Sequence, residues 1–496
     1  MTKKEIRTQY SGFILFTAKL LTVATGIAFA LIIARSVTQS EYGVWGTLNI
    51  IIPYFTLLSS AFPFWIMRFV ARDKEGATKT GILANMIIAA IATLVYIALL
   101  PLIITAFRFE DYIMLYSIAA AQIIEIYLIA VLEAALSAQR PHFVGYGLLV
   151  GDVCKVLLAY IFIIELQLSL LGAVISIIIA FAIKIAFYFK TVLKELQNKI
   201  VFGYIKEWVK GSAFNIYNLM GDRIAAVVFL MLPMYGGEIA TSYYQAAVPI
   251  ANIITYSSLL AFALYPKILA GGKIEDATTS LKMVLMFTIP MTAGVIALPD
   301  SYLIILRDIY IAATPVLIIL TADALILTVS SFFMSVLYGI EKIDEKGKIM
   351  FKQVAKSRLF IAFSLPYIHS AITLPTTFYV LTNFTNNQPL LVATYVTAIN
   401  TAAHLAMFIA LYFIVRKAVK VKIPWKSIAK YVFASTTMAS ILFIIPHPTK
   451  IHLTLGVTAM GGIIYISLLM IIDKEARLLA NSAWREIKFM VRGIST

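Results

Sequence analysis

The sequence predicts an all-α, polytopic membrane protein with about fourteen transmembrane helices. Of its 496 residues, 61% are hydrophobic and only 13% are charged, whereas about a quarter of the residues of a soluble domain are charged. Apolar runs of about 20 residues, the length of helix that crosses the hydrocarbon core, recur along the whole chain. These runs do not alternate apolar and polar residues as the strands of a membrane barrel would, so the spans are helices.

The apolar runs between charged or turn-rich breaks give the expected spans. They lie at 11–33, 44–66, 81–107, 112–136, 145–165, 169–189, 212–233, 242–265, 282–305, 314–338, 357–381, 390–415, 430–446 and 452–472. Two further segments, 190–210 and 473–492, mix basic residues with Leu, Ile, Phe and Trp. They are expected either to lie along the inner membrane surface as amphipathic helices or only to supply charges that set the topology.

The basic residues are distributed unevenly between the two sides of these spans. Of 41 Lys and Arg, 33 fall in the N-terminus, in or at the edges of the even-to-odd loops, and in the C-terminal tail, and four fall in the opposite loops. Basic loops stay in the cytoplasm, so both termini are predicted to be cytoplasmic in a multi-pass protein of the cell membrane. The net charge of +16 is thereby explained by topology, and no nucleic-acid partner is expected.

The chain is predicted to contain an internal repeat. The outer turn after the first span and the turn after the seventh each lead to an aromatic residue, Trp45 and Tyr243, and the acidic residues Glu125 and Asp323 have the same offset of 198 residues. Six spans per unit make the two copies parallel. We expect an N-terminal lobe at 1–200, a C-terminal lobe at 201–425, and two additional helices with a tail at 426–496. Two facing bundles of this kind suggest a transporter whose central cavity opens to the two sides in alternation.

The seventh span carries a polar stripe. Ser212, Asn215, Asn218 and Asp222 recur at three- and four-residue spacing and so share one helix face. Arg223 lies about 100° around the helix, at the edge of the stripe. Adjacent residues do not face each other on a helix, so Asp222 and Arg223 are not expected simply to neutralise one another. The stripe is expected to border water or a polar ligand.

Lys19 and Arg223 are the candidate ligand-binding cations, because neither has an acid three or four residues away. A charge at mid-bilayer costs about 2.5–3.5 kcal/mol on insertion scales and normally faces a cavity or a partner. Cations in a cavity favour an anionic substrate, and arginine suits phosphate oxygens particularly well. The expected substrate-binding set is therefore Lys19, Asn215, Asn218, Asp222 and Arg223.

Other charges within the spans have structural explanations. Asp152 and Lys155 lie one turn apart and are expected to form a structural ion pair. Lys184 is near enough to the inner edge of the membrane for its ammonium group to reach the interface. His369 and His404, near mid-span, are expected to be neutral, hydrogen-bonded histidines.

The acidic residues Glu125 and Asp323 each have two possible interpretations. Each is either a protonated packing residue or part of an ion-coupling site.

The chain contains no GxxxxGK[ST], no HExxH and no cysteine-based metal cluster, so we expect neither an enzyme nor a cofactor or metal. Transport would then be driven by an ion or substrate gradient, or would run downhill.

Several stretches resemble one family. IIARSVTQSEYGVWGTL, WIMRFVARDKEG, DRIAAVVFLMLPMYGGEIATSYYQAA and ALYPKI are similar to segments of Wzx-like polysaccharide flippases of the multidrug/oligosaccharidyl-lipid/polysaccharide (MOP) exporter superfamily. The resemblance implies a V-shaped bundle of two six-helix lobes plus two helices. It implies translocation of a polyprenyl-pyrophosphate- or dolichyl-phosphate-linked oligosaccharide to the outer leaflet, with cavity cations, here Lys19 and Arg223, on the phosphate groups. The implied partners are the lipid-linked oligosaccharide, membrane lipids and glycan-assembly proteins.

Two other functions fit the same sequence. A cation-coupled multidrug antiporter of the same superfamily would depend on cavity acids, so that Glu125, Asp222 and Asp323 would matter more than the two cations. A non-transporting membrane scaffold for glycan assembly would depend on none of them.

Overall fold

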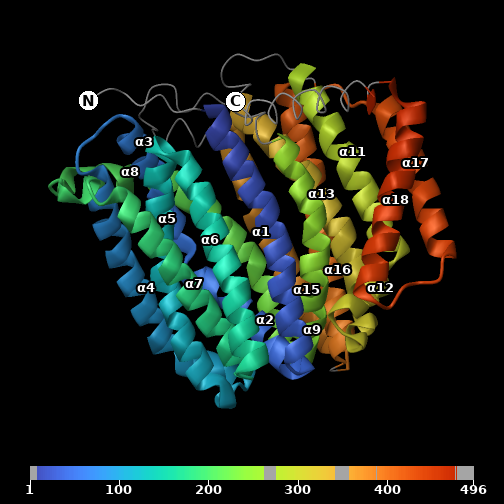
Figure 1. Ribbon diagram of the computed structural model, residues 1–496, viewed down its shortest axis with the longest axis horizontal. Coiled ribbons are helices and arrows are strands. Elements are labelled where there is room, and N and C mark those ends of the chain that lie inside the picture. Colours follow the sequence, from blue (N-terminus) through green and yellow to red (C-terminus); the bar gives the residue numbers. More distant parts are fainter. Residues whose placement is uncertain are drawn as a thin grey trace. The chain divides into compact units, whose positions relative to one another are not determined.

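A computed structural model describes residues 8–261, 275–340, 357–386, 388–419, 421–474 and 476–477, and all regular structure in these ranges is helical (Figure 1). The sequence segment ALYPKI and nearly all of the expected C-terminal surface helix lie outside them. The longer helices are α1 (Thr8–Ser36), α2 (Gln39–Phe55), α3 (Pro63–Ala71), α4 (Ala77–Phe107), α5 (Ile113–Gln139), α6 (Pro141–Ala159), α7 (Ser169–Val192), α8 (Phe202–Ala226), α9 (Met231–Thr255), α11 (Glu275–Ala297), α12 (Pro299–Leu306), α13 (Thr314–Ile340), α15 (Arg358–Phe384), α16 (Pro389–Ala418), α17 (Trp425–Ile444) and α18 (Ile451–Ile472).

Within the described ranges, 11 helical segments are long and apolar enough to cross a membrane, or up to 12 if the bent pair of α2 with η1 and α3 is one span. The bend measures 52° and corrects the expected continuous helix at 44–66. Pro53 removes a backbone donor near the end of α2, and Pro63 begins α3 at a position where its missing N–H costs nothing. Pro299 divides the expected helix at 282–305 into α11 and α12 in the same way.

The chain forms two compact units. Unit 1 comprises Met1–Pro249 and Ile343–Ala403, and unit 2 comprises Ile250–Lys342 and His404–Thr496. These units do not follow the expected boundaries at residues 200 and 425, so the division into two six-helix lobes stays a prediction.

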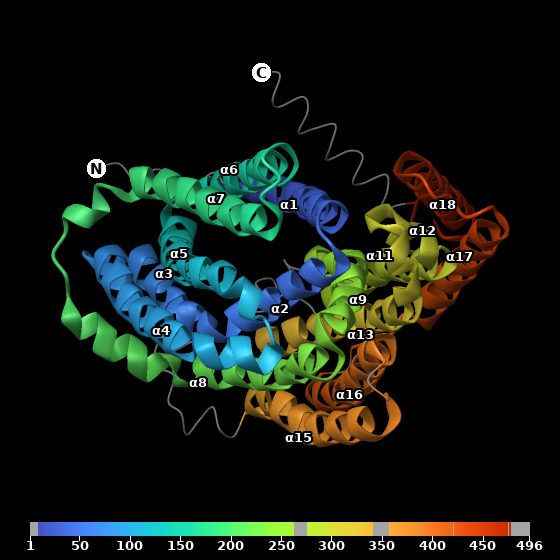
Figure 2. The ribbon, with the colours of Figure 1, turned by 90° about the horizontal axis from the view of Figure 1, so that it is seen from below.

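Unit 1 is organised around α5, which packs against both α4 and α7. Figure 2 shows α1, α6 and α7 on one edge of the unit and α4 and α8 on the other, with α5 between them. Trp208, in the second turn of α8, is fully buried against Phe62 and Phe69. This burial corrects the expected surface helix at 190–210: α7 continues to Val192, and α8 begins at Phe202 and enters the core.

The helices α2 and α9 meet where the repeat was expected. Gly237 has φ 64° and interrupts α9 within the predicted turn. Directly after it, Glu238 accepts a hydrogen bond from Ser40 Oγ at 3.2 Å, across the same offset of 198 residues. Gly43 allows close approach of the two helices, since a Cβ there would run into the backbone of Glu238.

The end of α6 departs from regular α-helical geometry. α6 ends in a π-helical segment, η3 (Tyr160–Glu165), whose wider turn is closed by a hydrogen bond from Leu166 N to Ile161 O at 2.9 Å.

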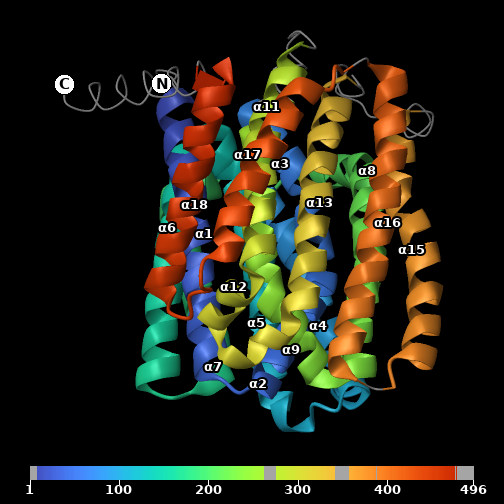
Figure 3. The same ribbon diagram turned by 90° about the vertical axis from the view of Figure 1, so that its right-hand side faces the viewer.

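In unit 2, α11 packs against α17 and α13, and α17 packs against α18. Figure 3 shows α11, α13, α17 and α18 side by side.

Candidate functional site

The α8 helix presents an apolar face and a polar face on opposite sides. Val209 and Met220 are 53% and 44% exposed and mark the apolar face. Asp222 is also exposed, but it lies about 160° from Met220 around the helix, since neighbouring residues differ by about 100°. A helix in lipid turns its apolar side outward. Asn215, Asn218 and Asp222 of the expected stripe therefore point away from these exposed apolar side chains.

Part of the stripe fastens α8 to its neighbour. Ser212 Oγ donates to the carbonyl of Ala61 at 2.9 Å, and Asn215 Nδ2 donates to the carbonyl of Ser60 at 3.2 Å. The segment that accepts these bonds is η1 (Leu57–Ser60) and the residue after it. Ser212 and Asn215 thus have structural partners, which leaves Asn218 and Asp222 as the polar residues of the stripe nearest Arg223.

The other side of α8 packs against α15. Tyr217 stacks on Phe360 and Tyr367, its hydroxyl is 2.8 Å from Ser364 Oγ, and Tyr367 Oη donates to the carbonyl of Tyr217 at 2.6 Å. Gly221 allows this approach, because a Cβ there would meet the ring of Tyr367. α8 is thus held on two sides, and the polar face with Asp222 lies between them.

Arg223 is half-buried and, in the described part of the chain, forms no ion pair or hydrogen bond. Its electrostatic neighbours are Asp222 and Tyr54 of α2. The Tyr54 hydroxyl is buried and has no hydrogen-bond partner among the described residues. Sequence reasoning missed Tyr54, because nothing in the pattern of α2 distinguishes it from a packing tyrosine.

Lys19 lies elsewhere in unit 1. It is half-buried on α1, which packs against α6, whereas α8 packs against α15 and η1. In Figure 2, α1 and α8 lie on opposite edges of the unit. The two candidate cations are therefore not on adjacent helices.

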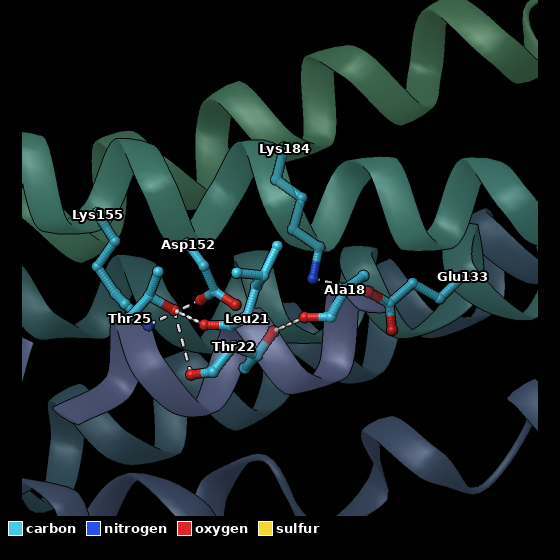
Figure 4. Close-up of polar contacts among 8 residues, drawn as sticks. All are labelled: Ala18, Leu21, Thr22, Thr25, Glu133, Asp152, Lys155 and Lys184. Carbon is cyan, nitrogen blue, oxygen red and sulfur yellow. Dashed lines mark hydrogen bonds and ion pairs between the residues drawn. The ribbon is translucent and has the colours of Figure 1, made fainter. Parts of the chain in front are cut away.

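One ion pair lies within α6, and a second joins α5 to α7 (Figure 4). Lys155 Nζ lies 2.8 Å from Asp152 Oδ1 within α6. Lys184, expected to reach the membrane surface, is instead only 8% exposed and lies 2.7 Å from Glu133 of α5. Glu133 also accepts a hydrogen bond from the Tyr188 hydroxyl at 3.1 Å. The expectation for Lys184 was wrong because its partner lies on another helix, beyond the reach of local spacing.

The two acids at matching repeat positions have different surroundings. Glu125 is half-buried, and its Oε2 has no hydrogen-bond partner among the described residues. Asp323, in unit 2, lies 2.7 Å from His404 Nδ1. Sequence reasoning singled out Asp323 and His404 separately and did not pair them. Among the described residues, no group of three or more His, Cys, Asp or Glu could hold a metal ion.

No protein-family model matches the sequence, and no curated protein matches it. Solved structures do. A lipid II flippase, MurJ, in an inward closed conformation, aligns with TM-score 0.70 at 16% identity over 93% of this chain and 99% of its own.

Two MATE transporters are also similar. An inward-facing multidrug resistance MATE family transporter of the MOP superfamily aligns with TM-score 0.56 at 13% identity over 80% of this chain and 95% of its own. The eukaryotic MATE transporter AtDTX14 aligns with TM-score 0.54 at 9% identity over 86% and 98%. With its many apolar helices, this chain is a multi-pass membrane protein that has the fold of the MOP-superfamily transporters.

Proposed function

We propose that this protein is a flippase that moves a polyprenyl- or dolichyl-(pyro)phosphate-linked oligosaccharide from the cytoplasmic to the outer leaflet by alternating access. The observation that carries the proposal is Arg223, a cation within a span that has no acidic partner across helices in the described part of the chain. Its guanidinium suits phosphate oxygens, and Asn218 and Asp222 would border the same ligand. Lys19 and Asn215 complete the proposed binding set from other parts of unit 1.

The lipid part of the proposed substrate is supported by an apolar cavity in unit 2. The cavity has a volume of about 280 Å³ and lies among the end of α9 (Ile250–Ile254), α11, α12, α17 and α18. Its lining is almost entirely hydrocarbon and includes Ile254, Phe287, Met291, Leu442 and Ile466. A purely polar glycan would gain nothing from such a surface, whereas a polyprenyl chain would bury apolar area there.

The proposed topology has fourteen spans with both termini in the cytoplasm. Counting α1, of 29 residues, as a span is consistent with its length, since a helix rises about 1.5 Å per residue. The break at Gly237 supports counting the continuous helical segment 202–258 as two spans. Two lobes at 1–200 and 201–425 and an appendage at 426–496 remain part of this proposal.

The proposal is tested by flipping assays in proteoliposomes with a fluorescent polyprenyl-diphosphate-linked disaccharide. We expect Arg223→Ala and Lys19→Ala each to slow flipping by about tenfold, the loss of one charge-assisted hydrogen bond of about 1.5–3 kcal/mol at its lower end. Met220→Ala, on the opposite face of α8, is the matched control and should flip at the unaltered rate. Wild-type rates in both cation variants would contradict the proposed binding site.

A cation-coupled multidrug antiporter is the second candidate. It is favoured by Glu125, whose Oε2 is buried and unpartnered among the described residues and could bind a coupling cation. In that case Glu125→Gln would abolish drug export while Arg223→Ala and Lys19→Ala leave the protein active. If all three variants behave as wild type in both assays, a scaffold role in glycan assembly gains support.

A further inference from the structure

The α2 and α9 helices lie against each other over two helical turns within unit 1. A Cβ on Gly43 would run into the backbone of Glu238, and a Cβ on Gly46 would come within 2.9 Å of Thr241 Cγ2 and 3.1 Å of Gln245 Cβ. A side chain at either glycine would therefore separate the two helices. α9 is held close to α2 from Glu238 to Gln245.

The main-chain carbonyl of Gln245 lacks its regular helical donor. In an α-helix this carbonyl would accept a hydrogen bond from the N–H of residue 249, and that residue is Pro249, which has no N–H. The fully buried Tyr42 of α2 supplies a donor instead, since its hydroxyl donates to Gln245 O at 3.4 Å. An unpaired carbonyl inside a membrane bundle is costly. Tyr42 therefore compensates, from a neighbouring helix, for the gap that Pro249 makes in the hydrogen bonds of α9.

Pro249 also lies where α9 passes from one compact unit to the other. Unit 1 ends at Pro249, and unit 2 begins at Ile250. Ile250, Ile253 and Ile254 line the apolar cavity of unit 2 that is proposed above for the lipid chain. A proline inside a helix is a place where the helix kinks. A change of bend at Pro249 would therefore move this wall of the cavity relative to the part of α9 that α2 holds.

We propose that Pro249 is a hinge in α9 and that Tyr42 is the residue that positions it, so that occupation of the apolar cavity is coupled to the α2–α9 contact. A hydrocarbon chain that enters the cavity displaces the wall formed by the end of α9. The bend at Pro249 transmits this displacement to the hydrogen bond between Tyr42 and Gln245. The choice of a polyprenyl chain as the ligand rests on the proposed function, whereas the hinge itself would serve a drug exporter equally.

A second tyrosine provides the matched control. Tyr96 of α4 is also fully buried, and its hydroxyl donates to the carbonyl of Tyr116 in α5 at 2.8 Å. Four residues after Tyr116 the helix has Ala120, whose N–H supplies the regular helical bond. Tyr96→Phe therefore removes the same kind of hydrogen bond, but from a carbonyl that keeps its helical donor.

The first experiment is a double-mutant cycle of Tyr42 and Pro249, read out as the unfolding temperature in detergent. We expect Tyr42→Phe to lower this temperature by about 1–2 °C, as the loss of one hydrogen bond would in a chain of this length. In the Pro249→Ala background the new N–H bonds to the Gln245 carbonyl, so Tyr42→Phe should lose most of its effect. Tyr96→Phe should have the same effect in both backgrounds. Equal effects of Tyr42→Phe in both backgrounds would overturn the pairing of Tyr42 with Pro249.

The second experiment measures main-chain hydrogen exchange at residues 250–255, with and without a long-chain polyprenyl phosphate in the detergent micelles. In the wild type the lipid should slow exchange there several-fold. Tyr42→Phe should speed exchange in the lipid-free protein, whereas Pro249→Ala should exchange slowly already and respond little to the lipid. Tyr96→Phe should behave as the wild type. An unchanged exchange rate on addition of the lipid to the wild type would overturn the coupling between the cavity and the hinge.

Flipping in proteoliposomes separates the hinge from the proposed function. Pro249→Ala should slow flipping of the disaccharide probe several-fold without lowering the unfolding temperature, because the stiffened helix resists bending. Wild-type flipping in Pro249→Ala would overturn the hinge in transport and leave the binding site at Arg223 standing. If the wild type does not flip the probe, but the lipid slows exchange after Pro249 and the double-mutant cycle shows coupling, the hinge stands and the proposed function is wrong.

Discussion

Charged residues within the spans need partners, because an uncompensated charge in the membrane interior is costly. The buried Lys184 and the half-buried Glu133 are 2.7 Å apart, and Tyr188 donates a further hydrogen bond to Glu133. In such a pair, the attraction mainly offsets the loss of hydration. Removing one member is therefore more damaging than removing both.

We expect Lys184→Met to destabilise the protein by about 1–3 kcal/mol, because the half-buried carboxylate of Glu133 loses its counter-charge. The double variant Lys184→Met with Glu133→Leu should recover most of this loss. Thermal unfolding of the purified protein in detergent measures both. Equal unfolding temperatures for the single and the double variant would show that the charge on Glu133 is not the cause.

A second residue-scale prediction concerns Glu195, between α7 and α8. Burial raises the pKa of its carboxyl group, opposed by a hydrogen bond from Thr78 and by the charge of Arg140. A raised pKa means that the folded state holds the proton more tightly than the unfolded state does. The stabilising contribution is therefore complete below the ordinary carboxyl pKa of about 4.3 and is lost as pH rises through the raised value. Glu195→Gln should weaken this pH dependence in unfolding temperatures measured across that window.

The charged positions could be predicted from the sequence, but their partners could not. Helical spacing finds Asp152 and Lys155 because both lie on one helix. It cannot find the contact of Asp323 with His404, which are 81 residues apart, or the electrostatic approach of Tyr54 to Arg223. These depend on which helices pack together, and apolar helices in lipid give little sequence signal of their neighbours.

Helical elements are positioned by small residues at close crossings. Gly43 on α2 lies against the backbone of Glu238, and Gly147 on α6 lies against the ring of Tyr188. Without a hydrophobic driving force between helices, such close packing is a main source of association in lipid. At Gly43, a methyl group cannot be accommodated by moving a flexible side chain, because the obstacle is the main chain of Glu238.

We expect Gly43→Ala to lower stability by about 1–3 kcal/mol through overpacking of the α2–α9 crossing. Gly456→Ala, in α18, makes the same chemical change where no atom lies within 4 Å of the added Cβ. There the better helix propensity of alanine should leave stability unchanged or raise it by about 0.5–1 kcal/mol. Unfolding temperatures of the two variants provide the comparison, and an equal change in both would exclude the crossing as the cause.

The existence and length of most spans followed from hydropathy, but two expected helices are broken. Pro63 and Pro299 lie within apolar runs of the sequence, but each is the first residue of a new helix. Hydropathy therefore predicted one helix where the backbone forms two. A proline at the first position of a new helix and a proline that kinks one helix look alike in sequence. The structure separates the two cases.

At the scale of the whole molecule, the distribution of basic residues predicts which loops face the cytoplasm. The single cysteine, Cys154, lies within a span, so a Cys154→Ser background permits single reporter cysteines. Lys194→Cys and Gln388→Cys introduce exposed thiols at predicted inner and outer positions. In intact cells a membrane-impermeant maleimide should label Gln388→Cys, whereas Lys194→Cys should react only after permeabilisation. The reverse pattern would invert the topology.

The division into two units was the feature least accessible from the sequence. The repeat offset of 198 residues indicated equal halves, yet the compact units exchange segments, so that 343–403 groups with the N-terminal residues and 250–342 with the C-terminal ones. Two long helices cross the boundaries between the units. α9 belongs to unit 1 up to Pro249 and to unit 2 after it, and α16 belongs to unit 1 up to Ala403 and to unit 2 after it.

The π-helical segment at Tyr160–Glu165 has a consequence for the register of α6. A π-turn accommodates one residue more than an α-turn. The side chains that follow the segment are therefore rotated about the helix axis relative to their directions in an uninterrupted α-helix. Deleting Ile161 should return the segment to a regular α-turn.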